Sequence, residues 1–464
     1  MRLTLPEPHI PKEGFTDEND IFGYREFGER LAKLISDINE PLVITLDGPW
    51  GSGKSVFIKQ WKGLMKEKYD GSVVYFDAFR NDIHDDAFLA LAHEIHFLAE
   101  DTLGKKNKPT QAFLDKAKKV GKALMPTGLR LAAHIGTAGL LNPQYVKAGD
   151  DAIKAISDAS RSETEEALEK TISEKLQKTK EERALLENFR KSLEKVSIDI
   201  TKKAQKKDKR PLPLIFIIDE LDRCRPPFAL DVIERVKHLF SVPNVCFMLV
   251  MDLPQFETAI RGVYGEKFDA GKYLEKFYHL KVILPGLDIV DRKQRDKYLN
   301  HLWKTLNPKF NKSIFDRIFY EEIQFLANAY KLSFREIERV MTNIVLATAT
   351  VNKNQWFVPP VVAGLCIMRQ RRSDLYALAR EDNLTWEDVK KFLKIGEDDG
   401  SNTEYSRKWV IIWWQCLVDK DPPQDVLDSF SQDAIRYNLR GRLSSLHILT
   451  NFIDNLPNPT ENPS

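Results

Sequence analysis

Cysteine is scarce in this sequence, with only Cys224, Cys246, Cys366 and Cys416 among 464 residues. No two of them form a C-x-x-C pair, so the sequence offers neither a disulfide framework nor a cysteine-based zinc site. This usage fits a reducing compartment, and we expect a cytoplasmic protein.

An excess of charge of either sign is also missing. The chain has 70 Lys and Arg residues against 68 Asp and Glu, which gives a formal net charge of +2. No field of the whole molecule therefore draws it onto nucleic acid or an anionic membrane, and any such attraction has to be local.

Long uninterrupted apolar runs are absent as well. The best candidate, residues 120–141, contains Lys122 and Arg130 and is broken by Pro126, whereas a membrane span needs about 20 mostly apolar residues. Residues 1–9 contain proline and glutamate where a signal peptide would have its apolar segment. We therefore expect neither a transmembrane helix nor export by that route, and at most peripheral contact with the inner face of a membrane.

The sequence does contain short apolar runs that alternate with helical patterns. Residues 42–46 and 72–76 read as strands, and the segment 55–65 between them has helical spacing. Two further apolar runs, 214–218 and 245–251, flank another helical pattern. This alternation predicts an α/β protein with a parallel sheet covered by helices.

The turn after the first strand carries the strongest motif. Residues 48–55 fit G-x-x-x-x-G-K-[ST], the phosphate-binding P-loop. We expect nucleotide contacts from Gly48, Pro49, Trp50, Gly51, Ser52, Gly53, Lys54 and Ser55. In such a loop the backbone N–H groups surround a phosphate, Lys54 reaches the terminal phosphates, and the Ser55 hydroxyl ligates Mg²⁺.

A second acidic motif completes the expected site. The apolar run 214–218 ends in Asp219 and Glu220, and we expect this strand to lie beside the P-loop strand. Asp219 would then hold Mg²⁺, and Glu220 would polarise a water for attack on the γ-phosphate. The pair therefore favours a Mg²⁺-dependent ATP hydrolase, although an acidic residue at a strand end can also simply cap the following loop.

These motifs, in this order, resemble the KAP family of P-loop NTPases. The resemblance rests on the P-loop, on Val-Tyr-Phe-Asp-Ala-Phe at 74–79 and on Ile-Asp-Glu-Leu-Asp-Arg-Cys at 218–224. It continues with Met-Asp-Leu at 251–253 and Tyr-Leu-Glu-Lys-Phe at 273–277 followed by Leu-Pro. Asp77 and Phe79 depart from the family, which more often has Asn and Trp there, and Asp-Glu replaces the commoner Asp-Asp.

The resemblance implies roles for further residues. Asp252, after the fourth apolar run, would sense the γ-phosphate, unless it is a helix cap. Arg335 would project toward the phosphates as a second sensor, unless it belongs to a solvated ion-pair face. Arg223 could reach a neighbouring subunit as an arginine finger, which implies a homo-oligomer or another protein partner. Bacterial relatives are associated with defence against bacteriophage, and antiviral defence is the role that the resemblance favours.

Domain boundaries follow from a connection that is far too long for an ordinary crossover. Residues 1–103 and 209–285 would form the two parts of the P-loop NTPase domain, and residues 104–208 would be a helical insertion between them. Residues 286–464 show helical patterns and would form a helical C-terminal region.

Two features could suggest a zinc site and a base-stacking surface, but a structural role explains them better. His93 and His96 do not have the spacing of a zinc motif, and Trp409, Trp413 and Trp414 lie among apolar residues, as a core does.

Two functional hypotheses remain open. The first is an ATP-hydrolysing conformational switch. The second is a non-catalytic scaffold that binds nucleotide structurally, while the insertion docks a partner, nucleic acid or a membrane surface. The basic run at 202–210, with six basic residues and one acidic residue, would serve the second hypothesis, although such runs are usually solvated faces.

Overall fold

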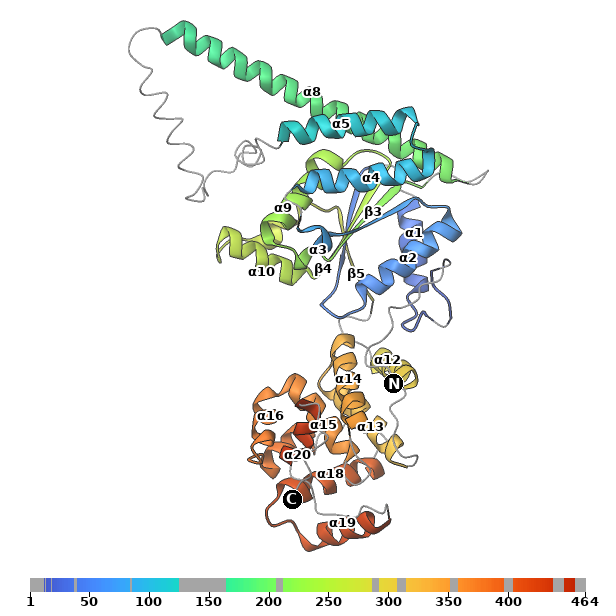
Figure 1. Cartoon of the computed structure of the whole chain (residues 1–464), viewed down its shortest axis with the longest axis vertical. Coiled ribbons are helices and arrows are strands. Elements are labelled where there is room, and N and C mark those ends of the chain that lie inside the picture. Colours follow the sequence, from blue (N-terminus) through green and yellow to red (C-terminus); the bar gives the residue numbers. More distant parts are fainter. Residues whose placement is uncertain are drawn as a thin grey trace.

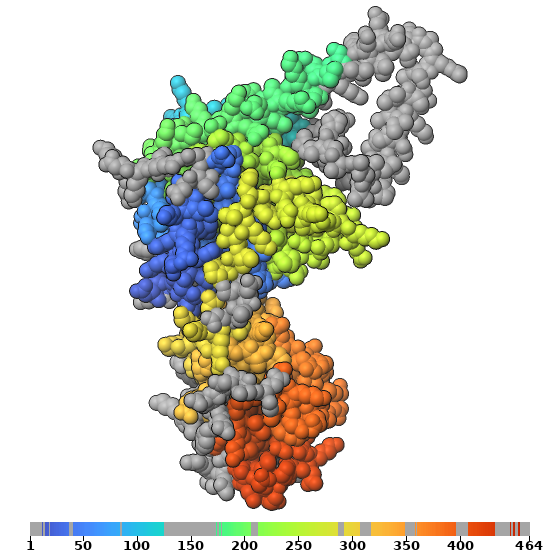
Figure 2. Space-filling model, turned by 180° about the vertical axis from the view of Figure 1, so that it is seen from behind, coloured from blue at the N-terminus to red at the C-terminus, as the bar shows by residue number. Residues whose placement is uncertain are grey.

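The computed structural model describes residues 12, 14–17, 19–36, 40–83, 86–124, 164–205, 212–285, 292–306, 314–350, 358–395, 404–436 and 446–454. These residues form an α/β part and a helical C-terminal region (Figure 1). Seen from behind, the helical region is a separate mass, orange to red, joined to the rest through a narrower section (Figure 2).

A parallel sheet is the centre of the α/β part. Its five strands are β1 (Leu42–Asp47), β2 (Val73–Asp77), β3 (Leu214–Asp219), β4 (Val245–Met251) and β5 (Leu280–Ile283). The order β2-β3-β4-β1-β5 places β4 between β1 and β3. The expectation that the acidic strand lies directly beside the P-loop strand is therefore wrong, because every β1 residue pairs with a β4 residue on that side. The α/β class and the parallel sheet are confirmed.

Both faces of the sheet are covered, as the near-continuous apolar strands require. In β3, alternate residues enter opposite cores: Ile215 and Ile217 face one layer, and Phe216 and Ile218 face the other. The first layer consists of α1 (Arg25–Ser36) and α2 (Lys54–Tyr69). The elements that contribute to the core on the other face are α3 (Ala78–Asn81), α4 (Ala87–Leu103), a 3₁₀-helix (Leu221–Arg223), α9 (Pro226–Arg235), a π-helix (Val236–Phe240), α10 (Leu253–Tyr264) and α11 (Ala270–Leu274).

The described part of the predicted insertion packs on the sheet domain. It comprises α5 (Lys108–Leu124) and α8 (Thr164–Ala204), whose 41 residues give a helix about 60 Å long. Phe113 of α5 and Phe189 of α8 are fully buried in the same core as Phe88 and Phe240. Figure 1 shows the N-terminal end of α8, far from Phe189, reaching beyond the body of the molecule. The proposed domain boundaries stay a prediction.

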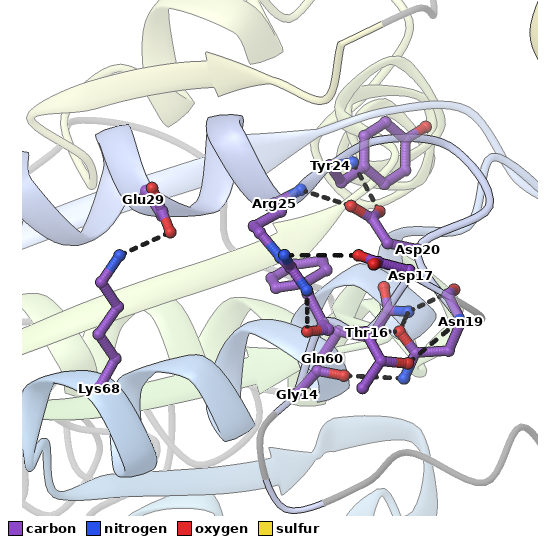
Figure 3. Close-up of polar contacts among 11 residues, drawn as sticks. Gly14, Thr16, Asp17, Asn19, Asp20, Tyr24, Arg25, Glu29, Gln60 and Lys68 are labelled. Carbon is purple, nitrogen blue, oxygen red and sulfur yellow. Dashed lines mark hydrogen bonds and ion pairs between the residues drawn. The ribbon is translucent and has the colours of Figure 1, made fainter.

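A segment before α1 is fixed to the helix that follows the P-loop (Figure 3). The Gln60 side-chain amide of α2 donates to the backbone oxygen of Asn19 at 2.8 Å, and the Asn19 amide donates to the Gly14 oxygen at 2.8 Å. Gly14 has a φ of 82°, and a Cβ there would lie 2.1 Å from the Gln60 carbonyl oxygen, so only glycine allows this crossing. The N-terminal segment is thus part of the P-loop layer.

The C-terminal region has its own apolar core. Its helices are α12 (Arg292–Leu306), α13 (Ile314–Ala329), α14 (Phe334–Thr350), α15 (Pro359–Arg371), α16 (Ser373–Arg380), α17 (Trp386–Phe392), α18 (Glu404–Val418), α19 (Gln424–Arg436) and α20 (Leu446–Asp454). Trp413 and Trp414 are 1% and 0% exposed, and Trp409 is buried with them, so the prediction that these tryptophans form core is confirmed.

Two further expectations concern membranes and metals. Among the described residues no helix is both long and apolar enough to cross a membrane; residues 125–141 of the apolar candidate lie outside them. The described residues also contain no cluster of three or more His, Cys, Asp or Glu side chains suited to a metal ion. His93 is largely exposed, and His96 lies 3.5 Å from Glu100.

Candidate functional site

The P-loop connects β1 to α2 at the carboxyl edge of the sheet. Gly51 and Gly53 have φ values of 79° and 89°, a region in which side chains with a Cβ are strained. The Gly48 N–H donates to the Met251 oxygen at 3.2 Å, which ties the loop to β4. The glycines therefore permit the curled backbone that the motif predicts.

Two observations test whether this loop suits an anionic ligand. Helix α2 begins at Lys54 and has no acidic residue in its first turn, so its positive end is left for an external negative charge. The hydroxyl of Ser52 is buried and has no hydrogen-bond partner among the described residues. Both features fit a phosphate group bound in the loop.

Lys54 lies folded against its own loop. Its ammonium group donates to the carbonyl oxygens of Gly48 and, at 3.1 Å, of Pro49. Burial lowers the pKa of Lys54, while neighbouring carboxylates oppose that shift. These carboxylates belong to Asp222, Asp252, Asp219 and Asp47. The positive charge of Lys54 thus offsets part of the negative charge of these four carboxylates.

Asp219 ends β3 and is only 1% exposed. Its carboxylate accepts hydrogen bonds from the Tyr75 hydroxyl and from the Glu220 backbone N–H, each at 2.9 Å, and the Ser55 side chain lies near it. Burial raises the pKa of Asp219, although these hydrogen bonds lower it in part. Ser55 and Asp219 thus form a contiguous oxygen pair, which suits Mg²⁺ because that ion keeps several of its waters and needs few protein ligands.

Glu220 follows with a left-handed backbone, at a φ of 61°. Its carboxylate lies 2.8 Å from the Arg223 guanidinium, and its side chain is 20% exposed. Burial raises the pKa of Glu220, and Arg223 opposes that rise. A raised pKa makes a carboxylate a better proton acceptor near neutral pH. Arg223, the candidate arginine finger, is paired within its own chain.

Asp252 is a helix cap, one of the two alternatives that the sequence left open, and it also contacts the P-loop. One carboxylate oxygen caps α10 by accepting from the Gln255 N–H at 3.2 Å. The other accepts from the backbone N–H of Trp50 at 3.0 Å. Asp252 is therefore a helix cap that also holds the P-loop, and its role as a γ-phosphate sensor stays a prediction.

We expect Asp252→Ala to weaken ATP binding about tenfold, because the P-loop loses a fixed anchor and must be ordered by the ligand. The measurement is isothermal titration calorimetry of the purified chain. Asp269→Ala is the matched control, since Asp269 caps α11 in the same way by accepting from Lys272 N–H at 3.1 Å. Equal affinities of the two variants would contradict the anchoring role.

Arg335, in the first turn of α14, lies against the P-loop from the helical region. A Cβ on Gly51 would come within 2.9 Å of the Arg335 Cβ and 3.3 Å of the Ser333 hydroxyl. The structure thus brings Arg335 to the loop, as the sequence led us to expect. A contact of its guanidinium with phosphate stays a prediction.

An aromatic contact that sequence reasoning missed joins the two parts nearby. The ring of Phe22 stacks on Phe334 of α14 with centroids 4.3 Å apart and lies 5.5 Å from Tyr298 of α12. A Cβ on Gly53 would lie 3.8 Å from the Phe22 ring. Phe22 therefore lies between the P-loop and the helical region. A single phenylalanine before a helix does not indicate in the sequence that it joins two parts of the fold.

Two polar contacts at the site were also missed. Asp47, the last residue of β1, forms an ion pair at 2.9 Å with Lys281 of the edge strand β5. The exposed indole of Trp50 donates to the carboxylate of Asp222. Asp47 precedes the P-loop motif and Asp222 lies within the motif at 218–224, but their partners depend on strand order and on the loop conformation.

A parallel sheet with a glycine loop opening a helix, and with an acidic strand end beside it, defines a nucleotide-binding P-loop NTPase. The family model described as the KAP family P-loop domain matches residues 24–351, most of the chain. The chain therefore belongs to the KAP family, as its motifs predicted. A comparison with curated proteins found no match.

Proposed function

We propose that this protein is a Mg²⁺-dependent ATPase that acts as a conformational switch. The observation that carries the proposal is the buried carboxylate of Asp219 at the end of β3, with the side chains of Ser55 and Lys54 near enough to lower its pKa and with Glu220 next in the chain. This arrangement unites the groups that phosphate binding, metal binding and water activation require.

In the proposed reaction each side chain has a separate task. Lys54 exchanges its carbonyl partners for phosphate oxygens, and the P-loop N–H groups hold the same phosphates. Ser55 and Asp219 would ligate Mg²⁺, which supplies positive charge to the phosphate oxygens when it is bound. Glu220 orients the attacking water and accepts its proton.

Arg335 is the proposed link to the helical region. The first turn of α14, which contains Arg335, lies on Gly51. A change in the loop on nucleotide binding or hydrolysis would therefore displace α14. The guanidinium would also stabilise negative charge that develops on the phosphates.

Hydrolysis is tested directly by phosphate release from ATP with Mg²⁺ and with an excess of chelator. We expect activity only with Mg²⁺. A wild-type chain that binds ATP but releases no phosphate would favour the second hypothesis, a nucleotide-bound scaffold that docks a partner, nucleic acid or a membrane surface.

For the biological setting we propose bacterial antiphage defence by a cytoplasmic protein, in contact with the membrane's inner face at most peripherally. The support is membership in the KAP family, with its phage-defence relatives. The switch would act on a protein partner or a second copy of the chain.

We expect Lys54→Ala to raise plaque counts at least tenfold in a host that depends on the gene, as measured by phage plating. An unchanged plating efficiency after deletion of the whole gene would remove the defence role.

A further inference from the structure

A second pocket lies in the helical region, between α12, α14 and α15. Its volume is about 630 Å³, within the range of small-molecule sites. Leu302 and Leu306 form an apolar wall, while Asn343 and Gln370 offer amide groups. No P-loop residue lines it, and Arg335 is the one residue that it shares with the nucleotide site described above.

Positive charge dominates this pocket. Three arginines line it, Arg335, Arg339 and Arg369, against the single carboxylate of Glu338. That carboxylate already accepts a hydrogen bond from the Tyr298 hydroxyl. The pocket therefore presents guanidinium groups that its own acidic residue does not balance.

Two of the three arginines have side-chain donors that are available to a ligand. Arg335 and Arg339 are exposed and, within the described part of the chain, form neither an ion pair nor a side-chain hydrogen bond. Arg369 lies 3.5 Å from Asp454 through one nitrogen and donates to the Ile453 oxygen at 3.2 Å through another. Arginine forks match phosphate oxygens in geometry and charge.

We propose that this pocket binds a small molecule with two or more phosphate groups, such as a nucleotide, at a site distinct from the P-loop. Two arginines one helical turn apart, Arg335 and Arg339, can hold adjacent phosphates, since residues four apart share a helix face. The amides and the apolar wall suit the rest of a nucleotide-sized ligand. The volume of about 630 Å³ suits such a ligand better than a nucleic-acid strand, which needs an extended groove.

Arg339 is the residue to test, because it is exposed and lies away from the P-loop. The probe is inorganic pyrophosphate, titrated calorimetrically into the full-length Lys54→Ala chain, whose P-loop is disabled. We expect saturable binding, and we expect Arg339→Gln in this background to weaken it about tenfold. Arg317→Gln is the matched control, since Arg317 is an exposed arginine of α13 paired only with Glu321 among the described residues.

The outcomes are distinct. Weaker binding in the Arg339 variant alone, with an unchanged melting temperature, supports the pocket. Pyrophosphate binding that is equal in all three chains would come from elsewhere and overturn the proposal, as would the lack of saturable binding. Binding of a ten-nucleotide single-stranded DNA in place of pyrophosphate would assign these arginines to nucleic acid and also overturn it. None of these readouts depends on ATP hydrolysis, so the proposal stands or fails apart from the proposed function.

Discussion

Replacing Lys54 with alanine should lower the affinity for ATP by about a thousandfold. The ammonium group would contact two phosphates, and each charge-assisted hydrogen bond contributes on the order of 1.5–3 kcal/mol. The variant also removes the positive charge that four neighbouring carboxylates share at the site: Asp47, Asp219, Asp222 and Asp252. These carboxylates would repel the incoming phosphates, so the loss exceeds that of one hydrogen bond.

Titration of a fluorescent ATP analogue, followed by anisotropy, measures this change. Lys59→Ala is the matched control, because Lys59 lies on the same helix but is exposed. If both variants bind the analogue like the wild type, the P-loop is not the nucleotide site. Thermal melting without nucleotide separates a binding defect from a folding defect.

The second large effect concerns Glu220, whose replacement by glutamine should leave ATP binding intact and slow hydrolysis by a factor of about 10²–10⁴. Glutamine keeps the size of the side chain but cannot accept a proton from water. It also retains the same backbone demand at the left-handed position, so the fold should be preserved. The expected signature is therefore a lower kcat with an unchanged affinity for ATP.

Single-turnover phosphate release, with binding measured in parallel, tests this prediction. Glu266→Gln is a suitable control, because Glu266 is exposed in the loop after α10. A Glu220→Gln chain that hydrolyses ATP at the wild-type rate would exclude Glu220 as the base. In that case the pairing of Glu220 with Arg223 would be its main role.

Local motifs made the centre of the site predictable from sequence. The glycines, Lys54 and Ser55 depend only on the chain between one strand and the next helix, and Asp219 only on the end of an apolar strand. The structure brings these residues together, and the family match supports their grouping. Their chemical roles remain proposals.

Long-range pairing was harder to predict. The edge strand β5 has four residues and alternates between intermediate and exposed positions, so its apolar signal was too weak to indicate a strand. The place of β4 between β1 and β3 is a matter of topology, which the apolar pattern of each strand does not encode. The same holds for the core that α5 and α8 share with the sheet, since helical spacing shows an apolar face but not what covers it.

Phe22 has a consequence for how the protein matures on the ribosome. It is synthesised before the P-loop, yet its ring partners Tyr298 and Phe334 emerge about 300 residues later, which at ordinary synthesis rates takes roughly 15–60 s. Until then the side chain beside Gly53 lacks its stacking surface, and Arg335 has not yet been synthesised. A nascent chain therefore forms the contacts between its P-loop layer and the helical region only after α14 has been synthesised.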